Sequence, residues 1–400
     1  MPRTRFEPVK LCLADLLGEP YIEAVCRARA VMTGNDLRGL SRLGHRRVQF
    51  LSQNYYRRLL DLLPRIGRSV TTPVAVSAGG ATTSEFARNS KPGWAPLSTL
   101  GFYRVGEDGR LFLTTKSEHY HVPLGHGFPG YALIEWARRL GIPNATHNNT
   151  RGHVTRLLEE ELVRAANGIR REDDAAWRRC ARSKRRTILN RVLNLETGSL
   201  AAEAALKMML SRFYRIHPDS PPPQYPNRLP VFVVIGDEEG GLQANYHGTT
   251  IFAQMLRGMW PEWLDRSDKH RLFRIVGVRP NNFEELRATF QEYEMKPYKI
   301  AGFIHEFVLM NYAGKRLIER FVRTAYSLCR KYDIPTLADE IQSCVWSPKL
   351  FLYHEYGVKP TFVAVGKGLP GGEYPASRLL FSAVMDTLPQ FGALVTNGQE

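Results

Sequence analysis

Hydrophobic residues recur at two spacings in the second half of the chain. Continuous runs rich in β-branched and aromatic residues, typical of strands buried on both faces of a parallel sheet, lie at 230–236, 299–307, 334–340 and 361–366. Apolar residues three and four positions apart predict helices at 156–166, 199–215 and 315–332. This alternation predicts an α/β fold whose mostly parallel sheet is covered by helices on both faces.

The N-terminal part of the chain has a different pattern. Residues 1–70 are rich in arginine and carry apolar residues at helical spacing, whereas 71–100 is rich in Ser, Thr, Gly, Pro and Ala and suits a loop. At 101–113 two apolar runs flank a Gly-Glu-Asp-Gly turn, which predicts a β-hairpin. We therefore divide the chain into a helical N-terminal extension and linker (1–95), the N-terminal part of a small domain (96–150) and a large domain (151–400).

Composition is that of a soluble globular protein, with 400 residues, 43% of them hydrophobic and 24% charged. No stretch approaches the roughly 20 consecutive apolar residues that a membrane-spanning helix needs, and the N-terminus lacks an apolar signal core. We expect a cytoplasmic protein with no membrane partner. The five scattered cysteines, without CxxC spacing, predict neither a disulfide framework nor a zinc site.

Positive charge is concentrated in one segment. The net charge is +16, and ten lysines and arginines crowd residues 164–191. A solvated and partly salt-bridged helix face is the favoured interpretation, because most charge runs have no partner. Binding of RNA, DNA or an acidic protein stays open as an alternative, although we expect no nucleic acid as the main partner. The sequence assigns no role to this basic cluster or to residues 1–95.

Candidate chemistry lies where the predicted strands end. Asp339 and Glu340 end one strand, Lys367 follows another between two glycines, and Glu306 lies at the end of a third. Ligands collect at the carboxyl ends of strands in a parallel sheet, so these side chains are expected near one site. Taken singly, a lysine after a strand is more often a surface charge, and Ala-Asp-Glu is a common turn.

Together these segments are far more specific, because Lys367 lies 28 residues after Asp339 (367 minus 339). The sequence Ala-Asp-Glu-Ile-Gln, followed at that distance by Gly-Lys-Gly-Leu, resembles the signature of the class III, fold-type I pyridoxal-phosphate aminotransferases. The resemblance extends from about residue 101 to residue 400. It implies pyridoxal 5′-phosphate as cofactor, with Lys367 as the imine-forming lysine and Asp339 as the partner of the ring nitrogen.

Further motifs resemble the same family in the same order. Gly198 and Ser199 open the helix in TGSLAAEAALK, where free backbone donors and the helix dipole suit a phosphate dianion. Taken alone, an ordinary Ser cap is the favoured interpretation of this motif. In the Tyr246-His247-Gly248 element, the resemblance implies that the Tyr246 ring stacks on the pyridine face. Thr396 matches a threonine that reaches the phosphate of the neighbouring subunit, which implies a homodimer.

Two softer assignments follow from the resemblance. Gln342 is expected to hydrogen-bond the ring hydroxyl oxygen, and Glu306 to order that side of the pocket. The implied reaction is a ping-pong transfer of an amino group from an amino acid or ω-amine to a 2-oxo acid, and neither substrate is identified by the sequence.

The chain departs from the family pattern at several places. Phe307 replaces the usual Pro, and Asn311 stands where many ω-aminotransferases have a second Glu. The chain ends directly after the threonine element, whereas relatives continue, so we expect an incomplete C-terminal small domain. An aminomutase-like enzyme and a non-catalytic pseudo-enzyme or scaffold are therefore alternatives.

Overall fold

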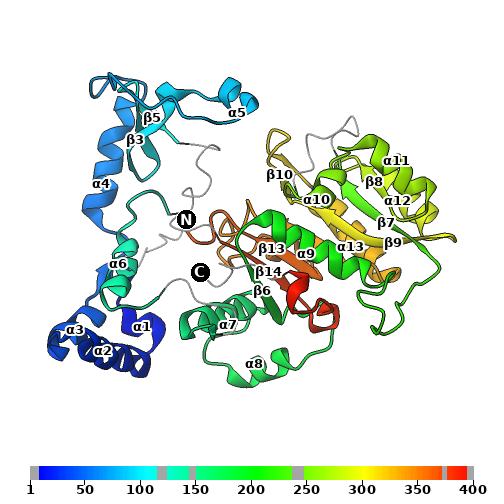
Figure 1. The fold of residues 1–400 in the computed structure, drawn as a ribbon, viewed down its shortest axis with the longest axis horizontal. Helices are drawn as coiled ribbons and strands as arrows, with labels where there is room; N and C mark the ends of the chain where they lie inside the picture. Colours follow the sequence, from blue (N-terminus) through cyan, green and yellow to red (C-terminus); the bar gives the residue numbers. More distant parts are fainter. Residues whose placement is uncertain (1–8, 115–123, 144–149, 237–246, 372–375, 394–400) are drawn as a thin grey trace, which may run out of the picture. The chain divides into compact units, whose positions relative to one another are not determined.

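The computed structural model describes residues 9–114, 124–143, 150–236, 247–371 and 376–393. The chain divides into two compact units, residues 1–144 and 145–400 (Figure 1). The functional division into an extension, part of a small domain and a large domain stays a prediction.

The first unit combines short helices with a small antiparallel sheet. Its helices are α1 (Leu13–Leu17), α2 (Glu19–Thr33), α3 (Leu37–Gly44), α4 (Gln53–Leu62), α5 (Ser84–Asn89) and α6 (Ala132–Arg139). Its strands are β1 (Lys10–Leu11), β2 (Val48–Gln49), β3 (Pro96–Leu100), β4 (Tyr103–Gly106) and β5 (Leu111–Leu113). The pairing of β4 with β5 confirms the predicted hairpin, to which β3 adds a third strand. Helices α2 and α4 confirm the helical pattern, and α5 is a short helix in the predicted loop.

The second unit is built on a seven-stranded sheet in the order β6-β14-β13-β12-β9-β7-β8. The strands are β6 (Arg191–Leu195), β7 (Leu229–Ile235), β8 (Arg274–Val278), β9 (Tyr298–His305), β12 (Thr336–Glu340), β13 (Phe362–Val365) and β14 (Ser377–Phe381). Strand β14 runs in the direction opposite to the other strands of this sheet, and the pairs that do not include β14 are parallel. All four predicted strands are present, and the mostly parallel sheet confirms the predicted fold class.

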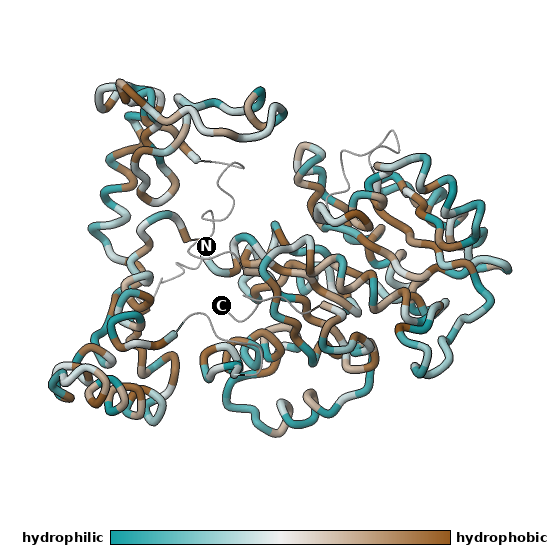
Figure 2. Tube along the Cα trace, viewed as in Figure 1, coloured by the Kyte–Doolittle hydropathy of each residue, from teal (hydrophilic) through white to brown (hydrophobic). Residues whose placement is uncertain are grey.

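Helices cover both faces of this sheet, as the alternation of strands and helices requires. The helices are α7 (His153–Asn167), α8 (Asp174–Ala181), α9 (Gly198–Leu210), α10 (Ile251–Met255), α11 (Pro261–Lys269), α12 (Phe283–Tyr293), α13 (Glu319–Lys331) and α14 (Tyr353–Tyr356). Alternate residues of β7 enter opposite cores: Val233 packs with α7, α12 and α13, whereas Phe232 packs with α9 and α10. Figure 2 shows hydrophobic residues concentrated in the strands and on the helix sides that meet them.

Helix α9 packs on the sheet through a buried side that carries four alanines beside Leu206, Met208 and Met209. Its alanines at 201, 202, 204 and 205 are at most 1% exposed. The helix packs against β13 and β14 (Figure 1). A Cβ atom added at Gly302 of β9 would lie 2.3 Å from the sulfur of Met209, so glycine permits the close approach on that strand. The position of α9 is therefore set by short side chains.

Two predicted helices have different limits in the structure. The helix predicted at 199–215 ends at Leu210, because the chain turns there and the side chain of Arg212 leaves to bind Asp333. The helix predicted at 315–332 begins at Glu319, because β11 (Lys315–Arg316) pairs with β10 (Val308–Leu309) in a small hairpin. Within the described ranges, every helix is too short or too polar to cross a bilayer.

Candidate active site

Three neighbouring strands bring their carboxyl ends to one edge of the large sheet. Ala338 of β12 pairs with His305 of β9, so Asp339 and Glu306 follow side by side. Asp339 in turn pairs with Ala364 of β13, and Lys367 comes three residues later. The predicted clustering of Asp339, Glu306 and Lys367 thus follows from the strand order.

Asp339 is a buried carboxylate held by two partners. Its side chain is 1% exposed, and its Oδ2 atom lies 2.9 Å from Nδ1 of His247, whose side chain is equally buried. Its Oδ1 atom accepts a hydrogen bond of 3.1 Å from the backbone N–H of Ile341. These contacts fix the orientation of a charge that burial would otherwise disfavour.

Glu306 and Gln342 form a second polar pair beside it. The Gln342 side-chain amide donates to Glu306 Oε1 at 3.3 Å. Glu306 Oε2 and Gln342 Oε1 are buried and have no hydrogen-bond partner within the part of the chain that the structure describes. Burial first, and then the Asp339 carboxylate, raise the pKa of Glu306 well above its ordinary value, so the protonated acid is favoured. Buried polar atoms left in this way usually indicate a missing partner.

Lys367 lies in a strained turn after β13. Its φ of 41° falls in the left-handed region, which a residue with a Cβ atom seldom adopts, and such strain is concentrated at functional sites. The side chain is half-buried. Burial first, and then Asp339, raise the pKa of Glu306, whereas Lys367 lowers it.

The N-terminus of α9 meets these strand ends. Thr197 caps the helix by accepting from the N–H of Leu200. A Cβ atom at Gly198 would lie 2.3 Å from Cδ1 of Ile341, so only glycine allows α9 to approach β12 so closely. Ser199 Oγ accepts from the N–H of Thr249 at 2.9 Å and lies 3.1 Å from its hydroxyl. The helix end thus offers backbone N–H groups and two hydroxyls, which are the donors that suit a phosphate.

The remaining candidate residues have other positions. Tyr246 and Thr396 lie outside the described residues. Glu340, next to Asp339, accepts from the backbone N–H groups of Leu352 at 2.6 Å and Tyr353 at 2.8 Å and so holds the start of α14. Neither the partner of His247 nor the role of Thr249 was predicted from the sequence. Gly248 packs against Ser199 at the start of α9, and Thr249 directly follows it. A hydroxyl residue next to the glycine of the Tyr-His-Gly element is the feature that would have indicated Thr249.

Comparison with known proteins places the chain among the aminotransferases. A model of the class III aminotransferase family matches residues 166–394. The ornithine aminotransferase of Plasmodium chabaudi chabaudi is 38% identical over 99 residues, which are 24% of this chain and 23% of that protein. The chain spans less than half the length of the curated ornithine aminotransferases that it matches.

Solved structures have the same fold. A transaminase from a marine Virgibacillus superposes with a TM-score of 0.58 at 18% identity, over 81% of this chain and 68% of that chain. The ornithine aminotransferase of Toxoplasma gondii, solved with partial occupancy of pyridoxal phosphate at its active site, gives a TM-score of 0.53 at 18% identity, over 76% and 62% of the two chains. These likenesses confirm the predicted fold. Because the matched family region is more than half of the sequence, this chain belongs to the class III aminotransferase family.

Proposed function

We propose that the chain binds pyridoxal 5′-phosphate and transfers an amino group from an amino acid or ω-amine to a 2-oxo acid. The observation that carries this proposal is the meeting of Asp339, Glu306 and Lys367 at neighbouring strand ends, beside the N-terminus of α9. Family membership supports the same activity.

The residues present fit the chemical groups of this cofactor. The buried Asp339 carboxylate suits a protonated ring nitrogen, because it supplies a fixed negative charge in a site shielded from water. The buried oxygen atoms of Glu306 and Gln342 suit the ring hydroxyl. Ser199 and Thr249 suit the phosphate. The Lys367 amine is the group that would bind the aldehyde carbon.

Each side chain has a distinct task in the proposed reaction. Bound pyridoxal phosphate supplies an electron sink for the electron pair left when the substrate carbon loses its proton. The Lys367 amine would take that proton and deliver it to the carbon derived from the cofactor aldehyde. Asp339 keeps the ring nitrogen protonated, and His247 orients the Asp339 carboxylate. An amino donor would occupy this site in the first stage and a 2-oxo acid in the second.

The substrates follow from the relatives and are part of the proposal. Because the curated relatives are ornithine aminotransferases, a diamino acid such as L-ornithine is the first donor to test. We also propose a homodimer, since the threonine element at 396 resembles one that serves the neighbouring subunit.

The test measures cofactor binding and amine turnover separately. The purified protein is titrated with pyridoxal phosphate, and the visible absorbance of the bound cofactor is followed as L-ornithine, N-acetylornithine and other α- and ω-amines are added. We expect one donor class to bleach the band and a 2-oxo acid to restore it. Lys367→Ala should abolish the bleaching, whereas Lys349→Ala, which removes an exposed lysine from the same unit, should preserve it.

Two results would argue against the proposal. A protein that binds no pyridoxal phosphate would refute the site itself. A protein that binds the cofactor, yet shows no change with any amine of the panel, would instead support the non-catalytic alternative.

A further inference from the structure

A second cavity lies at the opposite ends of the strands that carry the candidate active site. It has a volume of about 860 Å³. Thr336, the first residue of β12, and Thr361, which directly precedes β13, both line it. Asp339 and Lys367 follow the other ends of these strands, so the cavity is separate from the active site and has no part in the proposed function.

The lining of this cavity is strongly positive. Five cations and one carboxylate line it, which leaves four positive charges in excess: Lys184, Arg186, Arg323, Arg330, Lys359 and Asp333. Like charges gathered around one space repel each other, and low-dielectric walls strengthen that repulsion. An anion bound in this cavity would therefore be attracted by its lining.

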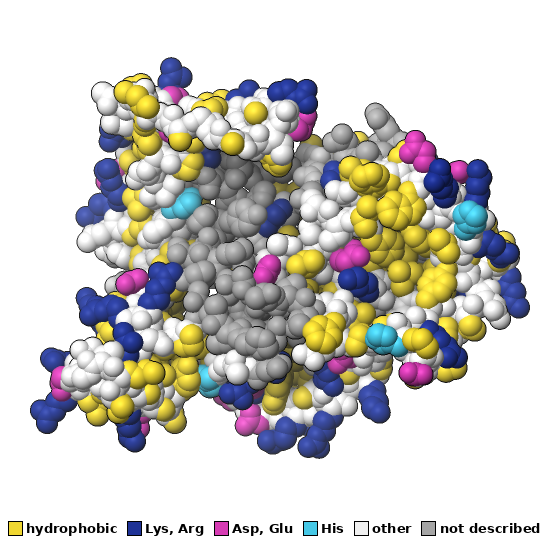
Figure 3. Space-filling view, viewed as in Figure 1, with side chains coloured by type: hydrophobic (Ala, Val, Ile, Leu, Met, Phe, Trp, Pro, Cys, Tyr) yellow, Lys and Arg dark blue, Asp and Glu magenta, His cyan; other side chains and the backbone are white. Residues whose placement is uncertain are grey.

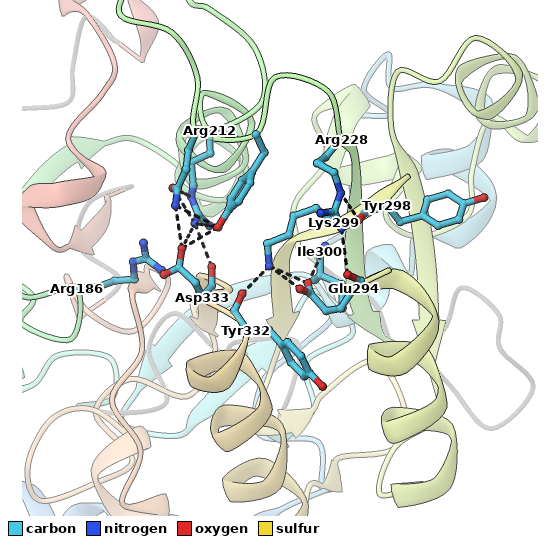
Figure 4. A network of polar contacts seen from close by, with 11 residues as sticks. Arg186, Arg212, Arg228, Glu294, Tyr298, Lys299, Ile300, Tyr332 and Asp333 are labelled. Atoms are coloured by element: carbon cyan, nitrogen blue, oxygen red, sulfur yellow. Dashed lines mark hydrogen bonds and ion pairs between the residues drawn. The ribbon is translucent and has the colours of Figure 1, made fainter. Parts of the chain in front are cut away.

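The single carboxylate is already bound by other partners. Asp333 pairs with Arg186 and accepts from Arg212 at 2.5 Å and from the Tyr225 hydroxyl at 2.9 Å (Figure 4). Arg212 is buried, and one of its terminal nitrogens has no acceptor among the residues described. Burial first, and then Arg186, lower the pKa of the Arg212 guanidinium, whereas Asp333 raises it. Asp333 is therefore engaged by Arg186, Arg212 and Tyr225 and pairs with none of the other cations that line the cavity.

Three of the lining cations are available for a ligand. Lys184, Arg330 and Lys359 form no ion pair within the described part of the chain. Arg323 by contrast donates to Glu319 at 3.2 Å and to the backbone oxygen of Tyr356. The free cations come from three separate segments, namely the loop after α8, the last turn of α13 and the loop after α14. These three cations are far apart in the sequence, and the fold brings them to the same cavity.

Size and lining favour a small ligand over a nucleic acid. The volume falls within the roughly 300–1,000 Å³ typical of small-molecule sites. Single-stranded nucleic acids bind to exposed aromatic rings on which bases stack, whereas the aromatic residue of this lining, Tyr326, is only 9% exposed. Arg178 and Arg179 of α8 are not part of the lining, and Figure 3 shows Lys and Arg side chains on the outer surface where α8 lies.

We infer that this cavity is a binding site for a small polyphosphate anion. Three cations without an ion pair among the described residues match a chain of phosphates better than a single phosphate, and arginine and lysine are side chains that bind phosphate oxygens strongly. Thr187, which is exposed, adds a polar residue to the lining, whereas the hydroxyls of Thr336 and Thr361 accept from each other's backbone N–H groups.

The probe for this inference is inorganic tripolyphosphate, measured by titration calorimetry on the full chain at physiological salt. The unsubstituted protein should bind it at one site per chain. The combined variant Lys184→Gln, Arg330→Gln and Lys359→Gln should weaken binding about tenfold or more, because a hydrogen bond to a charged group is worth at least that factor. These three side chains are exposed, so the fold should persist, which thermal unfolding checks.

A matched control separates a built site from general positive charge. Arg178→Gln, Arg179→Gln and Arg182→Gln remove three exposed positive charges outside the cavity and should leave tripolyphosphate binding within about twofold, since screening at physiological salt weakens distant charges. Equal losses in both variants, or no binding by the unsubstituted chain, would overturn the inference. A third result would also overturn the inference: the unsubstituted chain binds a single-stranded RNA but no tripolyphosphate, and only the control variant loses the RNA. That result would assign the basic cluster to nucleic acid. None of these readouts depends on amine turnover.

Discussion

Replacement of Glu340 by glutamine should change how the stability of this protein depends on pH. The Glu340 side chain is fully buried, and burial raises its pKa from an ordinary 4.5 to about 8 in the folded protein. In the unfolded chain the carboxyl group ionises above its ordinary pKa, whereas in the folded chain it keeps its proton up to about pH 8. The stabilisation from the bound proton is therefore complete below pH 4.5 and is lost as pH rises to about 8.

The expected size follows from proton linkage. Each pH unit between the two pKa values lowers the free energy of unfolding by about 1.4 kcal/mol, so the window from about pH 5.5 to 7.5 is worth roughly 2.7 kcal/mol. Glu340→Gln has no such proton to lose, and its side-chain oxygen can still accept from Leu352 or Tyr353. The unsubstituted protein should therefore lose roughly 2.7 kcal/mol more than the variant across that window.

Urea unfolding at several pH values between these limits measures the difference. Glu284→Gln, which removes an exposed carboxylate from the start of α12, is the matched control and should run parallel to the unsubstituted protein. If the Glu340→Gln and unsubstituted profiles also run parallel, Glu340 is ionised in the folded protein. The argument from burial would then be wrong, and the two backbone N–H groups would be strong enough to hold the charge.

Two further substitutions test the geometry of the candidate site. Gly198→Ala should cost about 1–3 kcal/mol of stability and weaken pyridoxal phosphate binding, because the new Cβ would lie 2.3 Å from Ile341 Cδ1. Adding Ile341→Val, which removes that Cδ1 atom, should recover part of the stability and part of the binding. An unchanged urea midpoint for Gly198→Ala would contradict the close packing of α9. His247→Ala removes the partner of the buried Asp339 carboxylate. The variant should bind the cofactor about tenfold or more weakly in a spectrophotometric titration. If the variant binds the cofactor as tightly as the unsubstituted protein does, Asp339 needs no support from His247.

The proximity of functional residues was predictable where the two strands that carry them follow each other along the chain. Asp339 and Lys367 belong to consecutive strands that pair directly, so their proximity follows from local order once a parallel sheet is predicted. The contact between His247 and Asp339 joins residues 92 positions apart. No periodicity encodes such a distance, and only packing of the loop before α10 against β12 produces it.

Three strands of the large sheet, β6, β8 and β14, were not predicted, and polar residues explain two of these omissions. Strands β6 and β14 contain Asn194, Ser377 and Arg378, which interrupt the apolar run expected of a buried strand. Arg378 is 2% exposed because its guanidinium donates to the backbone oxygens of Leu195 and Ser377. Hydrogen bonds that satisfy a buried charge depend on the finished fold, so hydrophobic pattern alone misses them.

The short side chains of α9 restrict where this protein can change. Ala201, Ala204 and Ala205 are buried in the core between the helix and the sheet, so a larger residue there would push the helix away from the strands and from Ile341. Selection for a new amino donor would therefore have to act on residues outside this helix. For an engineer, α9 is the part of the scaffold to leave untouched.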